Sequence, residues 1–213
     1  TVTHLSDRKS RQMIRRAASN NEEATVVVCG CYAQTAGREL LGIDEVDLIL
    51  GTNERHKIVQ AVEEHKKTLE RKVYLPDDET MTEFEPLSHN HFSTRTRASI
   101  KVQEGCDQFC SYCIIPYARG PLRSRKLEET LDEIRTLIAS GHKEVVLTGI
   151  HLGAYGKGIK DEKISLDELC EAILDQTDLS RLRLGSVEVT EITDKLIDRM
   201  QKDPRLVPHL HLP

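Results

Sequence analysis

Three cysteines within eight positions constrain this chain more than any other feature of its sequence. Cys106, Cys110 and Cys113 have the spacing C-x3-C-x2-C. Soft thiolate ligands select zinc, copper(I) or an iron–sulfur cluster. A [4Fe–4S] cluster has four irons, so three cysteines leave one iron open to another molecule, as a catalytic centre requires. The spacing therefore predicts a metal centre with one open position.

The alternative is a structural zinc site, or a ferredoxin-like cluster whose fourth ligand lies elsewhere in the chain. Zinc sites usually combine one C-x2-C pair with a second pair, and no second pair follows here at zinc-finger spacing. The sequence therefore favours an iron–sulfur cluster over zinc.

Composition limits the compartment and the partners. The 213 residues are 38% hydrophobic and 31% charged, which is typical of a soluble globular protein of one large or two modest domains. The sequence has no apolar run of about 18 residues and no signal peptide, and its clustered cysteines favour a reducing cytoplasm. The net charge is −5, so any contact with nucleic acid has to come from local basic patches.

The first third of the chain reads as alternating helices and strands, which indicates an α/β unit with a parallel sheet, part of a flavodoxin-like or Rossmann-like domain. Asp7 and Asn53 are the expected helix caps, and Cys31 follows the carboxyl end of a strand, where α/β sheets bind ligands. The basic side chains of the first helix are expected to form a solvated face, with phosphate contact as the alternative. The expected elements are a helix at 7–19, a strand at 24–28, a helix at 35–41, a strand at 47–51 and a helix at 54–67.

Residues 74–97 are predicted to be an exposed linker, because two prolines and an acidic run leave little apolar surface to bury. The predicted domains are therefore 1–73 and 98–213. The chain starts at Thr1 and stops within an expected strand, so both domains are expected to be incomplete.

The second domain reads as βαβαβαβ, which suits about half of a (β/α) barrel of the TIM type. Its first strand would deliver the cysteine loop at the end where such barrels place their active sites. Ser165 and Glu168 form a capping box, and Cys170 lies on an apolar helix stripe and is expected to be core. The expected strands are 99–104, 144–148, 181–186 and 207–212, and the expected helices are 127–140, 165–176 and 193–201.

Charged and polar side chains near the expected strand ends are candidate binding residues. Arg119, Arg123 and Arg125 would form a basic patch beside the cysteine loop that contacts substrate phosphate. Pairing with Glu128 and Glu129 is the structural alternative. His209 and His211 alternate with leucines and are expected to face the barrel interior as satisfied core groups, with contact to a bound cofactor or substrate as the alternative.

The cysteine motif, with Tyr112 before its last cysteine, resembles the signature of the radical S-adenosylmethionine (SAM) superfamily. The resemblance implies that the open iron of the cluster chelates SAM, and that the reduced cluster cleaves SAM to a 5′-deoxyadenosyl radical. It also implies SAM contacts from the later loops and strand ends, which fall here on Tyr112, Pro116, Gly149, Ser186 and Glu188.

Within that superfamily, three stretches resemble the amino-terminal domain of the methylthiotransferases. They are Thr1-Val2-Thr3, the run at 7–12 and Gly30-Cys31-Tyr32-Ala33-Gln34. The resemblance implies a second [4Fe–4S] cluster that holds or supplies sulfur, with Cys31 as the third of its three ligands. The other two ligands would precede Thr1, so this fragment is expected to bind at most one complete cluster and to lack full turnover; Cys29 is taken as a bystander.

Four further runs, at 95–99, 103–106, 114–116 and 118–125, most resemble the subgroup that methylthiolates N6-threonylcarbamoyladenosine beside the tRNA anticodon. The resemblance implies tRNA as the substrate and a flavodoxin- or ferredoxin-type reductant, and leaves the sulfur donor open. The remaining alternatives are the isopentenyladenosine tRNA enzymes, the ribosomal-protein methylthiotransferases and an iron–sulfur electron-transfer protein without turnover.

Overall fold

The computed structural model describes residues 3–76, 81, 83–85, 96–159 and 163–213. These residues form two compact units. The first comprises Thr1–Met81 together with Asp107–Gly120, and the second comprises Thr82–Cys106 together with Pro121–Pro213. The chain therefore passes from the first unit to the second, back to the first, and to the second again.

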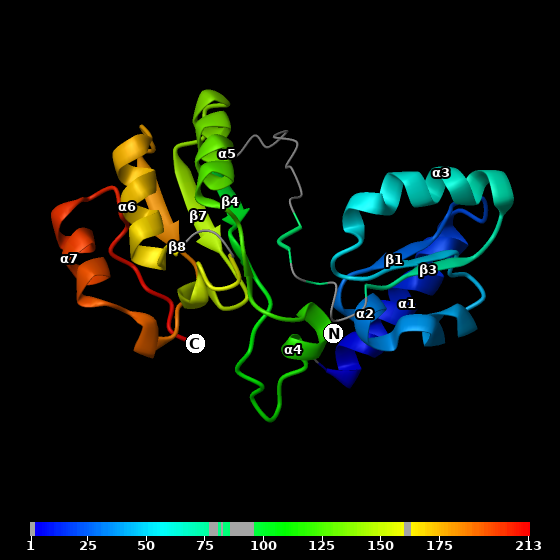
Figure 1. Cartoon of the computed structure of the whole chain (residues 1–213). Helices are drawn as coiled ribbons and strands as arrows, with labels where there is room; N and C mark the ends of the chain where they lie inside the picture. Colours follow the sequence, from blue (N-terminus) through cyan, green and yellow to red (C-terminus); the bar gives the residue numbers. More distant parts are fainter. Residues whose placement is uncertain (1–2, 77–80, 82, 86–95, 160–162) are drawn as a thin grey trace. The chain divides into compact units, whose positions relative to one another are not determined.

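The first unit is a parallel sheet with helices on both of its faces (Figure 1). Strands β1 (Val27–Cys29), β2 (Leu48–Leu50) and β3 (Lys72–Tyr74) pair in that order. Its helices are α1 (His4–Asn20), α2 (Cys31–Ala36), η1 (Gly37–Gly42), η2 (Arg55–Lys57), α3 (Ile58–Thr68) and α4 (Ile115–Arg119).

Alternate side chains of β2 face opposite layers of this unit. Ile49 belongs to an apolar cluster with residues of α1 and α2, whereas Leu48 and Leu50 pack with Ala61 of α3. All three strand residues are fully buried. Parallel strands covered on both faces read as continuous apolar runs, which is why the sequence identified this strand and the parallel α/β class correctly.

Two predicted caps in the first unit are wrong. Helix α1 begins three residues before the expected position, and Thr3 caps it by accepting a hydrogen bond from the backbone N–H of Ser6 at 3.2 Å. Asn53 caps neither η2 nor α3, since no side chain makes a capping hydrogen bond at either start. Thr3 and Asp7 both carry a short side-chain oxygen, and composition alone does not decide between them.

The predicted linker is partly structured, which corrects its description as exposed. Tyr74 ends strand β3, Met81 is fully buried against the first unit, and Glu85 is buried as well. The Thr52 hydroxyl lies 3.9 Å from the Met81 sulfur. Residues 77–80, 82 and 86–95 of that prediction lie outside the described residues.

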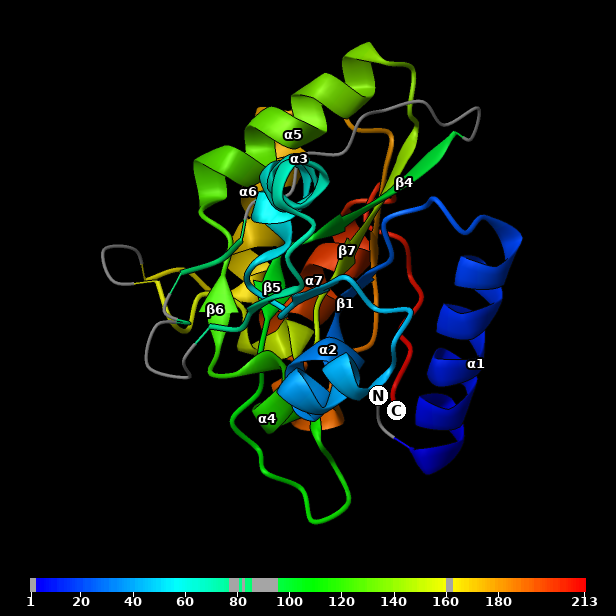
Figure 2. The same cartoon turned by 90° about the vertical axis from the view of Figure 1, so that its right-hand side faces the viewer.

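The second unit contains a parallel sheet in the order β4 (Arg97–Lys101), β7 (Glu144–Thr148) and β8 (Arg181–Leu184). A short antiparallel pair, β5 (Gln103–Glu104) with β6 (Arg123–Ser124), lies beside it (Figure 2). The helices are α5 (Leu127–Ala139), η4 (Leu152–Ala154), α6 (Leu166–Gln176), η5 (Val189–Glu191) and α7 (Asp194–Lys202). The predicted parallel β-α-β-α-β order is confirmed.

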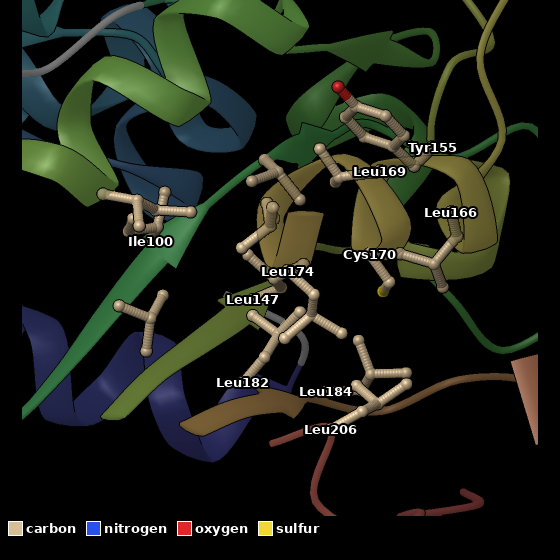
Figure 3. Close-up of a cluster of buried hydrophobic side chains, with 14 of the residues drawn as sticks. Ile100, Leu147, Tyr155, Leu166, Leu169, Cys170, Leu174, Leu182, Leu184 and Leu206 are labelled. Atoms are coloured by element: carbon tan, nitrogen blue, oxygen red, sulfur yellow. The ribbon is translucent and has the colours of Figure 1, made fainter. Parts of the chain in front are cut away.

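The core of the second unit lies between the sheet and α6 (Figure 3). Leu147, Leu182 and Leu184 of the strands meet Leu169 and Leu174 of the helix. Cys170 is completely buried in the same cluster, and this burial raises the pKa of its thiol to about 12. The predictions that Cys170 is a core residue and that Ser165 and Glu168 form a capping box are both confirmed.

The predicted fourth strand at 207–212 does not form a continuous ladder. It is represented by isolated bridges, Leu182 with Leu206 and Ser186 with His211. Pro208 interrupts the stretch and has no N–H to donate to a ladder. His209 and His211 are exposed, so the prediction that they are core groups is wrong.

Asp203, which follows α7, carries an acid-sensitive part of the second unit's stability. Arg205 donates to its carboxylate at 2.8 Å and Arg199 at 3.0 Å, and these contacts, led by Arg205, lower the pKa of Asp203 to about 2. A lowered pKa means that stability is present above the ordinary value of 3.8 and is lost as the pH falls towards 2.

We expect Asp203→Asn to remove the part of the loss of stability between about pH 4 and pH 2 that Asp203 contributes. Urea midpoints measured across this range would show it as a flatter profile. Asp198→Asn is the control, because Asp198 makes an exposed pair with Lys202 at 3.4 Å on the same helix. Parallel profiles for the parent chain and Asp203→Asn would contradict the expectation.

Candidate functional site

The cysteine loop leaves β5 at Gly105, whose φ of +76° lies in the left-handed region that favours glycine. All three cysteines of the loop are free thiols; Cys110 is exposed, and Cys106 and Cys113 are half-buried. Cys106 belongs to the second unit, whereas Cys110 and Cys113 belong to the first. The structure thus confirms that a loop following a strand end carries the motif.

In the first unit, Cys110 and Cys113 flank a tight turn. The backbone N–H of Cys113 donates to the Cys110 carbonyl at 2.9 Å. Phe109 has a φ of +44°, which is uncommon for a residue with a side chain, and its ring makes an edge contact with Tyr117 at 5.7 Å. Strained backbone of this kind is found at sites where the surrounding structure imposes it.

A pocket of about 600 Å³ lies beside this turn in the first unit. Tyr112, Cys113 and Tyr117 of the loop line one side of it. Arg11 of α1 and Tyr32 of α2 line another, joined by a hydrogen bond of 2.8 Å from Arg11 to the Tyr32 hydroxyl. Tyr112, a predicted SAM contact, is 84% exposed and is therefore accessible to a ligand.

Helix α4 fixes the end of the loop to the first unit. Pro116 stands in its first turn and is buried, as expected for a residue that stiffens the exit of the loop. The helix packs on α2, and the Thr52 hydroxyl donates to the Ala118 carbonyl at 3.1 Å. From the same helix, Arg119 Nε donates to Cys31 Sγ at 3.0 Å.

The contact between Arg119 and Cys31 was not predicted. The sequence assigned Arg119 to a basic patch for substrate phosphate, and Cys31 to a separate metal site. The two residues are 88 positions apart, and nothing in a single sequence reports a contact of that range. The structure instead directs Arg119 Nε at the thiol of Cys31.

The predicted basic patch is wrong for its other two members. Arg123, in β6, is only 1% exposed, and the side chain of Arg125 is 11% exposed. Arg125 pairs with Glu133 of α5 and lies 3.9 Å from Glu129. The expected pairing of Arg125 with Glu129 is therefore present at 3.9 Å, but the main partner of Arg125 is Glu133, which the sequence did not name.

In the second unit, Cys106 lies beside a buried histidine. Its Sγ is 3.9 Å from Nδ1 of His151, and Nε2 of His151 is 2.7 Å from the carboxylate of Glu191. Gln103 accepts a hydrogen bond from the backbone N–H of His151 at 2.7 Å. The sequence gave neither His151 nor Glu191 a role.

Gly149, a predicted SAM contact, approaches Gln103 closely. A Cβ at this position would lie 2.9 Å from the Cβ of Gln103, which is closer than real Cβ contacts. The absence of a side chain therefore has a packing reason, whether or not a ligand also binds here. The remaining predicted contacts, Ser186 and Glu188, are exposed, and the Ser186 hydroxyl is 2.7 Å from His211 Nδ1.

The donor set of the cysteine loop fits a [4Fe–4S] cluster bound through three cysteines. Three free thiols lie on one short loop, each at least partly accessible, and soft thiolates suit iron–sulfur clusters. No three His, Cys, Asp or Glu side chains among the described residues are gathered as the ligands of a single ion. The fit therefore depends on the chemistry and spacing of the donors.

The described residues do not complete the ligand set of a second cluster. Cys31 is the thiol that matches the family pattern, and the neighbouring Cys29 is exposed at the end of β1. Within the described part of the chain, no third donor joins them.

Comparison with known proteins places the chain in a family. The model of the radical SAM superfamily matches residues 100–208, and a second model, described as Uncharacterized protein family UPF0004, matches residues 1–51. The chain therefore belongs to the radical SAM superfamily, whose members use a [4Fe–4S] cluster and SAM.

Among its curated relatives is the threonylcarbamoyladenosine tRNA methylthiotransferase MtaB of Bacillus subtilis, which is 40% identical over 100% of this chain and 47% of the relative. MtaB of Aquifex aeolicus is 36% identical over 100% of the chain and 51% of the relative. A tRNA-2-methylthio-N(6)-dimethylallyladenosine synthase of Staphylococcus haemolyticus is 33% identical over 94% of the chain and 39% of the relative. The chain thus spans about half the length, or less, of these relatives.

One solved structure is similar in fold. It is the radical S-adenosylmethionine methyltransferase TsrM from Kitasatospora setae, at a TM-score of 0.61 and 15% identity, over 90% of this chain and 42% of the other. In the described part of the chain, no helix has the length and apolar character that crossing a bilayer would need.

Proposed function

We propose that the protein is a tRNA methylthiotransferase that acts on N6-threonylcarbamoyladenosine at position 37, beside the anticodon. The observation that carries the proposal is the C-x3-C-x2-C loop, which follows strand β5 in a radical SAM domain. The 40% identity to MtaB over the whole chain supports this substrate over the other tRNA bases.

Cys106, Cys110 and Cys113 are the proposed ligands of a [4Fe–4S] cluster whose fourth iron binds SAM. If bound here and reduced, such a cluster would supply the electron for the cleavage of SAM, the chemistry by which hydrogen can be removed from an unreactive carbon. The electron would come from a flavodoxin- or ferredoxin-type protein. The free thiols require reducing conditions, which favours the cytoplasm.

The chain's own residues hold this site in place. Pro116 and the packing of α4 on α2 fix the end of the loop. Tyr112 offers an exposed ring for the adenine of SAM. Gly149, Ser186 and Glu188 are proposed as further SAM contacts, the carboxylate of Glu188 accepting from ribose hydroxyls.

Cys31 is proposed as one ligand of a second [4Fe–4S] cluster, with Arg119 orienting its sulfur. No reaction step is assigned to that cluster, because the described residues do not complete its ligand set. Residues 1–73 are proposed as the amino-terminal methylthiotransferase domain and 98–213 as the radical SAM domain.

Deletion of the gene tests the substrate. Total tRNA from the deletion strain is expected to lack 2-methylthio-N6-threonylcarbamoyladenosine and to retain the unmethylthiolated base, as measured by nucleoside mass spectrometry. Persistence of the methylthio nucleoside, in a strain without a redundant enzyme, would reject the substrate assignment. Loss of the methylthio isopentenyl nucleoside instead would identify the second candidate, which the Staphylococcus haemolyticus relative favours.

A further inference from the structure

A buried polar group stands behind the first cysteine of the loop. His151 is only 6% exposed, and its two ring nitrogens face different partners within the second unit. Nδ1 faces Cys106 Sγ at 3.9 Å, and Nε2 faces the Glu191 carboxylate at 2.7 Å. The ring therefore bridges a carboxylate and a candidate metal ligand that lie 85 positions apart along the chain.

The backbone of His151 is also fixed by a hydrogen bond, to the side chain of Gln103. The fully buried Gln103 accepts from the His151 N–H at 2.7 Å through its side-chain oxygen. Its amide nitrogen donates to the carbonyls of Glu104 at 2.8 Å and Gly105 at 2.9 Å, directly before Cys106. One side chain thus ties the start of the cysteine loop to the backbone of His151.

Gly153 makes room for the carboxylate of Glu191. A Cβ at position 153 would lie 1.9 Å from Glu191 Oε2 and 2.7 Å from Glu191 Cβ, so any side chain here would displace Glu191. Gly153 has no unusual backbone angle, because its φ lies outside the left-handed region. The position of Glu191 explains why residue 153 is a glycine. A substitution at position 153 is therefore a second way to disturb the contact between Glu191 and His151.

We propose that His151, held by Glu191 and Gln103, is a positioning residue that orients the sulfur of Cys106 for the cluster. The inference rests on the proposed function, in which Cys106 is a cluster ligand. Nδ1 can accept the S–H of a thiol or, in a protonated ring, donate to a thiolate, so the contact serves either state of the sulfur. Groups outside the coordination shell that hold a metal ligand in place typically contribute about 10–100-fold to metal affinity.

Two substitutions of His151 test its two ring contacts, with Cys106 and with Glu191, one at a time. His151→Asn keeps an amide group near the position of Nδ1 and loses the group that faces Glu191. His151→Gln keeps a group near Nε2 and loses the one that faces Cys106. After anaerobic reconstitution of the chain, the rate of iron release to a chelator is expected to rise about tenfold in His151→Gln and His151→Ala, and less in His151→Asn.

Gly153→Ala tests the contact without touching His151 or any cysteine. It displaces Glu191 and is expected to raise the rate of iron release and to change the electron paramagnetic resonance spectrum of the reduced cluster. His142→Ala is the matched control, since His142 is a buried histidine of the same unit whose ring bonds the Leu137 carbonyl at 3.2 Å. It is expected to lower thermal stability while leaving the spectrum unchanged.

The outcomes distinguish this inference from the proposed function. If the parent chain assembles a cluster and the His151 and Gly153 variants match it in iron release and spectrum, the positioning role is overturned while the proposed function stands. Equal rates in His151→Asn and His151→Gln, both raised, would also reject the contact to Cys106. If the parent chain assembles no cluster under the same conditions, the proposed function fails and the inference fails with it.

Discussion

Cys110→Ala is expected to leave the chain without its cluster. The variant keeps two thiols, Cys106 and Cys113, and two cysteines are too few to hold a [4Fe–4S] cluster that already has an open iron. The parent chain is expected to bind about four irons after anaerobic reconstitution, and the variant close to none. Production of 5′-deoxyadenosine from SAM under reductant is expected to disappear with the iron.

Cys170→Ala is the matched control for this substitution. It also removes one thiol, but that thiol is completely buried in the core, where burial raises its pKa to about 12. Its iron content is expected to equal that of the parent. Parental iron in Cys110→Ala would remove Cys110 from the ligand set, and about eight irons in the parent chain would show that a second cluster forms after all.

Leu147→Ala is expected to lower the free energy of unfolding of the second unit by about 2–5 kcal/mol. Leu147 is fully buried in β7, the central strand of the sheet, and packs against apolar residues of both neighbouring strands and α6. Removing three carbon atoms there leaves a cavity that a rigid sheet fills poorly. Urea denaturation followed by circular dichroism measures the change.

Leu212→Ala is the control for the core substitution, because Leu212 is 47% exposed and lies outside the apolar cluster. Its effect is expected to stay within about 0.5 kcal/mol. A loss below about 1 kcal/mol in Leu147→Ala would mean that the sheet relaxes around the cavity, contrary to the packing described for this unit.

The elements that the sequence predicted best are those with strong local patterns. Helix α5 and strand β7 agree with their predicted ranges to within one residue, and the start of α6 follows from its capping box. Strand β3 was missed because Lys72-Val73-Tyr74 is short and only half-buried, so its pattern is weak. Helix α4 was missed because a helix of five residues has no period to detect.

In the candidate site, too, the residues in a local motif could be predicted from the sequence, whereas the contacts between distant segments could not. The three loop cysteines could be identified from spacing, because the motif is contiguous. The contacts of Cys31 with Arg119 and of Cys106 with His151 depend on chain segments 88 and 45 positions apart, which only the fold brings together. The burial of Arg123 was equally invisible, since a run of arginines reads as surface unless packing is known.

The order in which the chain visits its two units limits how the protein can be dissected. A fragment that ends at Met81 lacks α4, so it would leave bare the surface of α2 on which that helix packs and the thiol of Cys31 that Arg119 meets. A fragment that starts at Thr82 would contain the segment Asp107–Gly120 without the rest of the first unit, to which this segment belongs. No single truncation point therefore separates the units. Expression of the first unit alone requires a fusion of Met81 to Asp107, and expression of the second requires a fusion of Cys106 to Pro121.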